Sequence, residues 1–300
     1  MKLFATLFSH RLFAFALLIT NGMIGPIRAA GEKPGPAVKV TVETGNYTVE
    51  FSGDRAWTIS RILHQGKTIT DRPGFYGTVF SPEGGHWIGT GHNEGGIEKI
   101  EQTTLTVDGK PCEFVDKAIY RGRRAELRKK SMLGPIRLDA TYIVTDDALW
   151  EEHRYAATEE VKIKVLYGFM HPFVPGSTEW IAEKADGTIV EGAFESKNGH
   201  PLKDDVKWTA LYDPTTERAT VIWYPEVLTG QGLKTFYWDK TVYHKLYNQL
   251  YSHATLAAGT RFEAQLIIRC AESNAASWKE RAKALAEEIE TQHAKGEDGF

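Results

Sequence analysis

Apolar side chains at every second position constrain the fold of this chain more than any other feature of its sequence. In one segment they recur at Ile136, Leu138, Ala140, Tyr142 and Val144. A strand with this period of two buries one face and exposes the other. Similar segments follow one another along most of the chain, separated by turns that contain Gly, Asn or Asp. The pattern indicates antiparallel strands joined by turns.

The predicted strands account for much of the sequence. They are residues 38–42, 47–51, 57–64, 100–107, 113–120, 136–144, 150–155, 161–169, 207–212, 219–224 and 262–268. In the strand of residues 161–169, the alternation continues to His171, which we expect on the same face as Tyr167 and Phe169. Residues 225–256 are rich in aromatic side chains and fit the period of two less well.

A helical period occurs at the C-terminal end of the chain. Its apolar stripe consists of Trp278, Ala282, Leu285 and Ile289. Many strands and one convincing helix predict an all-β fold, a large antiparallel β-sandwich with a C-terminal helix. We expect the sandwich over residues 37–272 and the helix, packed on the sandwich, over residues 273–294.

The N-terminus has the features of an export signal. Lys2 and Arg11 precede an apolar run over residues 12–20, which is short for a membrane span. We therefore predict a signal peptide over residues 1–29, a linker over residues 30–36, and a periplasmic or secreted protein. After removal of the signal, no membrane partner is expected. The alternative is a membrane anchor that stays attached.

Composition and charge limit the possible partners. The 300 residues are 42% hydrophobic and 25% charged, as in ordinary globular proteins. The formal charge is −3, and it becomes −6 when the first 30 residues, with three cations and no acid, are removed. A mildly acidic chain has no electrostatic attraction to nucleic acid. Cys112 and Cys270 are the two cysteines, and the sequence leaves open whether they form a disulfide.

A glycine-rich stretch, residues 84–98, gathers polar and aromatic side chains. It contains His86, Trp87, His92, Asn93 and Glu94. Glycine permits positive φ and close approach to a ligand, and loops on a rigid scaffold often carry functional groups. We predict that His92 and Glu94 are catalytic, and that His86, Trp87 and Asn93 bind substrate. The alternative is a plain connection between strands whose histidines are merely exposed.

Three segments resemble one known group of proteins. Trp57–Lys67 is similar to an early strand pair that ends in a Gly-Lys turn, and Gly168–Phe173 is similar to a His-x-aromatic segment on a central strand. The third segment, Leu256–Leu266, ends the β region of a chain that we expect to form two broad sheets. The chain thus resembles the galactose mutarotase-like group, whose fold is a β-supersandwich. That fold also serves glycan-binding modules and polysaccharide lyases, so it does not settle the chemistry.

The resemblance implies roles for particular residues. In the group, one histidine protonates the ring oxygen of a sugar, a carboxylate removes a hydroxyl proton, and a second histidine holds the substrate. His171 matches the motif histidine, His92 is the candidate partner, and Glu94 is the nearest carboxylate. Imidazole and carboxylate groups suit such proton transfer. The alternative for His171 is a hydrogen-bonded histidine on a strand face.

A second chemistry, the lyase reaction on a uronate polymer, would use other residues. Arg121 and Arg123 open a basic stretch, continued by Arg124 and residues 128–130, that could bind an acidic glycan. Tyr243 and His244 could transfer protons.

Aromatic side chains could stack on sugar rings. We predict that Trp238 and Lys240, like Trp87, bind substrate. The alternatives are a solvated strand face for the basic stretch and core positions for the tryptophans.

Other site types lack their signatures. His86 and His92 have no Cys pair or His-Glu-x-x-His helix beside them, and no Gly-x-Ser-x-Gly, phosphate loop or dinucleotide fingerprint occurs. No metal and no cofactor are expected. The sequence therefore predicts an exported carbohydrate-active enzyme that transfers protons on a sugar or uronate, as a lyase or an aldose epimerase. The alternatives are a non-catalytic glycan-binding module and a structural protein of the cell envelope.

Overall fold

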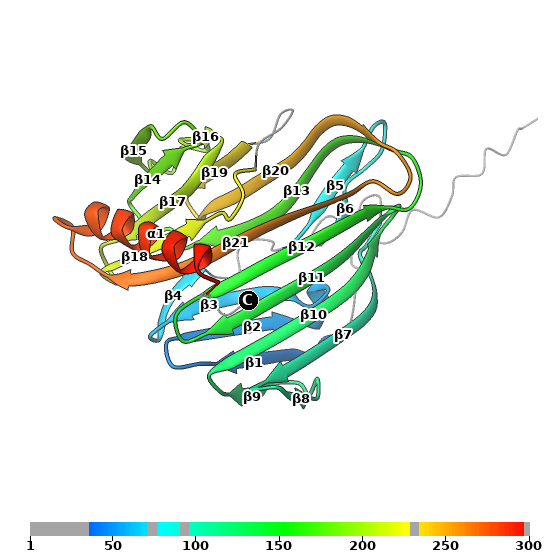
Figure 1. The fold of residues 1–300 in the computed structure, drawn as a ribbon, viewed down its shortest axis with the longest axis horizontal. Coiled ribbons are helices and arrows are strands. Elements are labelled where there is room, and N and C mark those ends of the chain that lie inside the picture. Colours follow the sequence, from blue (N-terminus) through cyan, green and yellow to red (C-terminus); the bar gives the residue numbers. More distant parts are fainter. Residues whose placement is uncertain (1–35, 71–76, 91–95, 229–233, 297–300) are drawn as a thin grey trace, which may run out of the picture.

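The chain folds into two large sheets that face each other, with one helix outside them (Figure 1). The computed structural model describes residues 36–70, 77–90, 96–228 and 234–296. The predicted all-β sandwich with a C-terminal helix is confirmed. The predicted signal peptide and all but the last residue of the linker lie outside the described residues.

The first sheet, sheet A, contains the N-terminal strands and four strands from the second half of the chain. Its order is β16-β19-β20-β13-β4-β3-β2-β1-β9, and β5 and β6 branch from β13. The bounds are β1 (Lys39–Glu43), β2 (Tyr47–Ser52), β3 (Thr58–His64), β4 (Lys67–Thr70), β5 (Val79–Pro82), β6 (Ile88–Gly89), β9 (Ala118–Arg121), β13 (Val161–Phe173), β16 (Lys203–Asp204), β19 (Lys234–Lys240) and β20 (Tyr243–Leu256). A short 3-10 helix, Gly53–Arg55, precedes β3.

The second sheet, sheet B, has the order β15-β14-β17-β18-β21-β12-β11-β10-β7-β8. The bounds are β7 (Lys99–Val107), β8 (Lys110–Cys112), β10 (Arg124–Leu133), β11 (Ile136–Thr145), β12 (Leu149–Ala157), β14 (Glu179–Lys184), β15 (Ile189–Ala193), β17 (Val206–Asp213), β18 (Arg218–Trp223) and β21 (Arg261–Glu272). Among the named strands, neighbours pair antiparallel except β1 and β9, which pair parallel.

Two strand predictions were wrong. Residues 113–120 do not form one strand, because the chain leaves sheet B after β8 and joins the edge of sheet A as β9. Residues 225–256 are more regular than predicted, since β19 and β20 form a hairpin there and β20 is 14 residues long. Both faces of β20 carry buried side chains over its first half, residues 244–250, which removes the alternation that a half-exposed strand shows.

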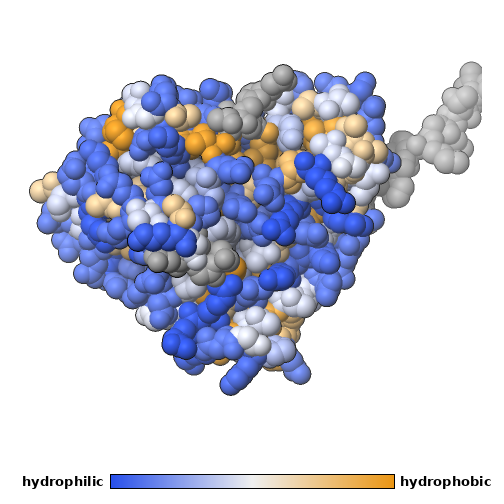
Figure 2. Space-filling view, viewed as in Figure 1, coloured by the Kyte–Doolittle hydropathy of each residue, from blue (hydrophilic) through white to orange (hydrophobic). Residues whose placement is uncertain are grey.

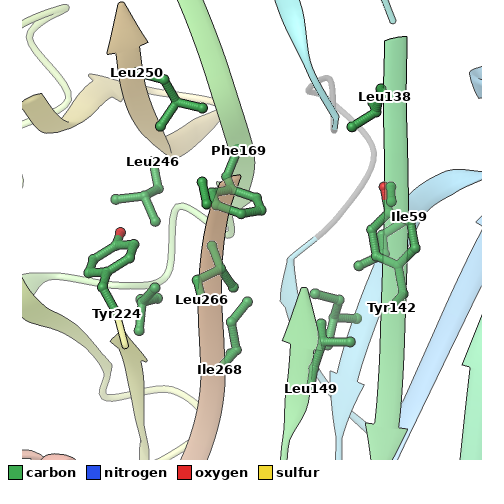
Figure 3. Packing of buried hydrophobic residues seen from close by; sticks show 14 of the residues in the cluster. Ile59, Leu138, Tyr142, Leu149, Phe169, Tyr224, Leu246, Leu250, Leu266 and Ile268 are labelled. Carbon is green, nitrogen blue, oxygen red and sulfur yellow. The ribbon is translucent and has the colours of Figure 1, made fainter. Parts of the chain in front are cut away.

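The core lies between the inner faces of the two sheets. Phe169 of β13, Leu246 and Leu250 of β20, and Leu266 and Ile268 of β21 point toward one another (Figure 3). Their strands belong to both sheets, so this cluster joins the two layers. Burial of such side chains contributes about 25 cal/mol per Å² of apolar surface and is the main stabilising term of the fold.

An irregularity in β13 changes which side chains face the core. The pairing of β13 with β20 shifts register between Leu166 and Tyr167 and again between Tyr167 and Met170. The shift places Tyr167 on the outer face of sheet A, whereas Phe169 lies in the core. The expectation that Tyr167 and Phe169 share a face is therefore wrong. His171, which is buried, follows Phe169 on the inner face.

Helix α1 (Trp278–Ala294) lies on the outside of sheet B, against β17, β18 and β21 (Figure 1). The four residues of its predicted apolar stripe are all buried. The helix begins later than residue 273, because the side-chain oxygen of Asn274 accepts hydrogen bonds from the backbone N–H groups of Ala276 and Ser277 and holds the preceding turn.

Two further observations concern the cysteines and the helices. Cys112 and Cys270 are free cysteines, on an edge strand and a central strand of sheet B. In the described part of the chain, no helix has the length and apolar character that a membrane crossing requires.

Trp278 anchors α1, and its replacement tests the packing of the helix. The indole stacks on Tyr212 with ring centroids 5.4 Å apart, and Nε1 lies within 3.2 Å of Glu179 Oε2, to which it donates a hydrogen bond. We expect Trp278→Ala to lower the free energy of unfolding by about 3–5 kcal/mol. Trp278→Phe keeps the stack and loses the hydrogen bond, so we expect a smaller loss. Urea denaturation measures both, and equal losses would contradict this account.

Candidate functional site

Aromatic rings line the outer face of sheet A. This aromatic face consists of Trp87, Tyr167, Phe236, Trp238 and Tyr247. Trp87 and Tyr167 stack with centroids 6.0 Å apart, and Tyr167 meets Tyr247 at 5.1 Å. Phe236 and Tyr247 stack at 4.9 Å, and Trp238 lies 6.1 Å from Tyr247. The rings therefore form one continuous row.

Strand register explains why these rings meet. Phe236 of β19 is paired with Tyr247 of β20, which is paired in turn with Met170 of β13. Paired residues share a face, so their side chains pack together. The bulge in β13 adds Tyr167 to the same face. Phe236 and Tyr247 are buried at the centre of the row, while the outer rings are partly exposed.

Polar groups border the aromatic face. Lys240 Nζ lies 3.8 Å from the centroid of the Trp238 ring, and Trp238 Nε1 donates a 2.8 Å hydrogen bond to Asn198 Oδ1. Tyr243 lies 6.4 Å from Trp238, between ring centroids. Of the residues predicted from the sequence, Trp87, Trp238, Lys240 and Tyr243 thus gather here. His86 is exposed and next to Trp87 in the chain.

Lys245 is a buried cation on the same side of β20. Its Nζ lies 5.0 Å from the centroid of the Tyr247 ring. Burial, assisted by the positive charge of Arg55, lowers the pKa of Lys245 from 10.5 to about 7. A primary amine with such a pKa exchanges protons near neutrality, which is unusual for lysine and typical of functional sites.

A second group of polar side chains lies between the sheets. This interior cluster consists of Glu98, Lys129, Glu151, His153 and His171, all buried. Lys129 Nζ lies 2.8 Å from Glu98 Oε1, and His171 Nε2 lies 2.9 Å from Glu151 Oε1. The side chains of Lys129 and Glu98 are 0% exposed, while those of His171 and Glu151 are 2% and 4% exposed. The two ring nitrogens of His171 and the Oε1 atom of Glu151 are therefore buried.

Hydrogen bonds stabilise the charged end of the interior cluster. Ser131 and Thr90 donate to the two oxygens of Glu98 at 2.6 and 2.8 Å. Lys129 Nζ donates to the backbone oxygen of Ala56 at 2.9 Å. An unpaired charge in this position would cost several kcal/mol, so these contacts are needed to keep both ions in the core.

Burial controls the titration of the neighbouring groups. It lowers the pKa of His153 to about 3, with a smaller contribution from the positive charge of Lys129. His153 is therefore neutral at physiological pH. Burial also raises the pKa of Tyr142 well above its ordinary value, and the charges of Glu151 and Glu98 raise it further. Among titratable groups of the cluster, the pair of Glu151 and His171 has the arrangement needed for acid and base chemistry.

His244 lies in a different environment from its predicted partner Tyr243. Its Nδ1 is 2.8 Å from Asp239 Oδ1, and its ring stacks on Phe194 with centroids 3.9 Å apart. Burial lowers the pKa of His244, and Asp239 partly offsets this shift. Neighbouring strand residues point to opposite faces, so Tyr243 and His244 are not brought together.

The other predicted residues lie apart from both groups. Arg121 lies on β9, at the far edge of sheet A from β19, and its Nε is 2.7 Å from Oε2 of Glu43 on β1. Arg123 is exposed beside it at the start of β10. Lys129 does not continue the basic stretch toward solvent, because it belongs to the interior cluster. His92, Asn93 and Glu94 lie outside the described residues.

Sequence reasoning missed several of these groups. Glu151 and His153 occupy the inward positions of the β12 alternation, between the core residues Leu149 and Tyr155, and that polar interruption was a readable signal. Phe236 and Tyr247 lie in the region that fitted the period less well. Within the described ranges, no three His, Cys, Asp or Glu side chains are arranged to hold a metal ion.

Comparison with known proteins adds only remote similarity. No protein-family model matches the sequence, and no curated protein matches it. One similar solved structure is the galactosidase domain of an alpha-galactosidase-sucrose kinase, at 11% identity and a TM-score of 0.48. This chain spans only 40% of that chain's length, and the match covers 78% of this chain.

Two smaller structures are similar over nearly their whole length. A galactose mutarotase-like protein from Clostridium acetobutylicum matches at 9% identity and a TM-score of 0.46, over 76% of this chain and 94% of that one. Galactose 1-epimerase from Lactobacillus acidophilus NCFM matches at 8% identity and a TM-score of 0.44, over 77% and 93%. These values assign no activity to this chain. Galactose mutarotase-like structures are among those to which the chain is similar, as the resemblance in the sequence implies.

Proposed function

We propose that this chain is an exported carbohydrate-active protein that holds a saccharide on the aromatic face of sheet A. The observation that carries the proposal is the continuous row of rings from Trp87 to Trp238. Sugar rings present C–H groups on their flat sides, and an aromatic ring offers a large apolar surface with a negative face to such groups. The partly exposed outer rings supply that surface.

Polar groups around the row can bind hydroxyl groups. Lys240 and Asn198 border Trp238, and the phenol of Tyr243 lies on the same side. A site of apolar rings with a few polar groups at its margin is typical of small-molecule binding. Export is proposed from the N-terminal sequence alone.

A second candidate function, proton transfer on an aldose, is favoured by the buried pair of Glu151 and His171. On one side, β13 pairs with β5 over residues 163–167 and with β4 only at Phe173. In the described chain, no strand covers the stretch between them on that side, where His171 lies. A lyase has less support, since Arg121 and Arg123 are remote from this pair.

Replacement of Trp238 tests the binding surface. Trp238→Ala should weaken saccharide binding by about 2 kcal/mol, roughly thirtyfold in Kd, because hot-spot tryptophans supply much of the contact energy. Titration calorimetry with neutral oligosaccharides measures the change. Tyr120→Ala, at the opposite edge of sheet A, is the control. Equal affinities of the Trp238 variant and the unchanged protein would contradict the proposal.

Replacement of the buried pair tests the second candidate. If the protein interconverts aldose anomers, Glu151→Gln and His171→Ala should each lower the polarimetric rate at least about a hundredfold, the usual contribution of general acid and base groups. His253→Ala, an exposed histidine on β20, should leave the rate unchanged. Circular dichroism separates loss of activity from loss of fold. An unchanged rate in folded variants removes both residues from the chemistry.

Lys245 predicts a pH dependence of stability. Its pKa is lower in the folded chain, about 7, than the ordinary 10.5. Between these values the unfolded chain binds more protons, so the free energy of unfolding should rise with pH across this window. Lys245→Met should lose this part of the rise. Chemical denaturation of both proteins at about pH 7 and about pH 10 measures the difference. Parallel pH dependences would show that Lys245 titrates normally.

A further inference from the structure

The outer face of sheet B carries an excess of positive charge. We define the cationic face as the outward side chains of β10, β11, β12 and β21. Its cations are Arg124, Arg128, Lys130, Arg137, Arg154, Arg261 and Arg269, and its acids are Glu126, Asp139, Glu152 and Glu263. Seven cations and four acids leave an excess of three positive charges, on a chain whose formal charge is −3. Figure 2 shows this part of the surface as predominantly hydrophilic.

Two hollows follow one another across the cationic face. One, of about 460 Å³, is lined by Tyr155 and Phe262 and by the charged residues Arg137, Asp139, Arg154, Arg261 and Glu263 around Ala156. The other, of about 490 Å³, is lined by residues that include Arg128, Glu152 and again Arg154. Arg154 belongs to both, so the two hollows are neighbours on the sheet. Such a row of sites suits an extended ligand better than a compact one.

The ion pairs on the cationic face leave three arginines without acidic partners in the described chain, and one of these, Arg269, donates a hydrogen bond to Gln292. Arg124 and Arg128 share Glu126, and Arg154 contacts Glu152 at 2.6 Å and Glu263 at 3.4 Å. Arg137 and Arg261 form no ion pair with any described residue.

The two arginines flank one small side chain. Both are cross-strand neighbours of Ala156, so they lie two strand spacings apart, about 9–10 Å. A carboxylate of a ligand can enter above Ala156 and meet a guanidinium on either side, in the bidentate geometry that arginine favours.

The acids in the same hollow narrow the class of ligand. Asp139 and Glu263 can accept hydrogen bonds from hydroxyl groups, of which each ring of a saccharide has several and the backbone of duplex DNA has none. A polymer that carries both carboxylates and many hydroxyl groups matches the arginines and the acids of this lining, respectively. We propose that the cationic face is a second saccharide site, which binds an acidic polysaccharide through its uronate carboxylates, with Arg137 and Arg261 as the main contacts.

The test uses the full chain and a panel of uronate polymers, namely polygalacturonate, alginate and hyaluronate. The unchanged protein should bind at least one of them, with an affinity that falls as salt is added. Fully methyl-esterified polygalacturonate keeps the sugar backbone but lacks the charges, so it should not compete. The double variant R137Q/R261Q should weaken binding by about tenfold or more.

Matched controls separate a built site from general charge. K110Q/K203Q removes two exposed cations elsewhere and should change the affinity less than about twofold. R137K/R261K keeps the charge but loses the bidentate geometry, and it should bind with intermediate affinity. R137Q/R261Q should bind neutral oligosaccharides as tightly as the unchanged protein does, which distinguishes this site from the aromatic face.

Three results would overturn the proposal. The first is that no uronate polymer binds the unchanged protein. The second is that K110Q/K203Q weakens binding as much as R137Q/R261Q, which would indicate a diffuse charge effect. The third is that duplex DNA binds as tightly as the uronates and loses affinity equally in R137Q/R261Q, which would identify a site for polyanions in general.

Discussion

The requirement that each sheet bury one face against the other governs this structure. Side chains alternate between core and solvent along a strand, so a shift of one residue transfers every following side chain to the other face. The bulge in β13 is such a shift, and it is tolerated because it is local. It turns Tyr167 outward to complete the aromatic face and leaves Phe169 and His171 inside. The irregularity thus decides that Tyr167, and not Phe169, lies on the outer face.

The interior cluster is an exception to the burial of apolar side chains between the sheets, and it costs free energy of folding. Two carboxylates and a lysine lie in a core that apolar side chains would fill without a desolvation penalty, and replacing buried ion pairs by apolar residues is often neutral or stabilising. The bonds to Glu98 from Ser131 and Thr90 reduce the cost but do not explain why the charges are there. Stability alone therefore does not account for the cluster. This cost is one reason for the proposal that Glu151 and His171 transfer protons.

Much of the fold could be predicted from the sequence, because strands with one buried face show their period directly. The apolar stripe of the helix, from Trp278 to Ile289, could be predicted in the same way. The hairpin of β19 and β20 was not, since β20 buries Leu246 on one face and Tyr247 on the other. The outward position of Tyr167 could not be predicted either, because a bulge leaves no mark in the sequence beyond a glycine such as Gly168.

Residues of the candidate site could be predicted from the sequence only where the type of side chain restricts what the residue can do. The sequence predicts that Trp87 and Trp238 stack on sugar rings, and the structure places both, partly exposed, at the aromatic face. His171 was chosen from a motif, and its partner Glu151 comes from the other sheet, so no spacing in the sequence connects them. His244 shows that a suitable residue type alone does not predict a role. Its contacts with Asp239 and Phe194 depend on tertiary packing that the sequence around it does not reveal.

The two outer faces of the sandwich differ because different elements cover them. Helix α1 covers the part of sheet B formed by β17, β18 and β21, where a second core of tryptophans lies. The strands β10, β11 and β12 carry charged residues on their outer face, as an uncovered sheet requires. Sheet A instead places apolar rings on its outer face, around β13, β19 and β20. The partial exposure of Trp87, Tyr167 and Trp238 is the reason that we propose a saccharide ligand for this face.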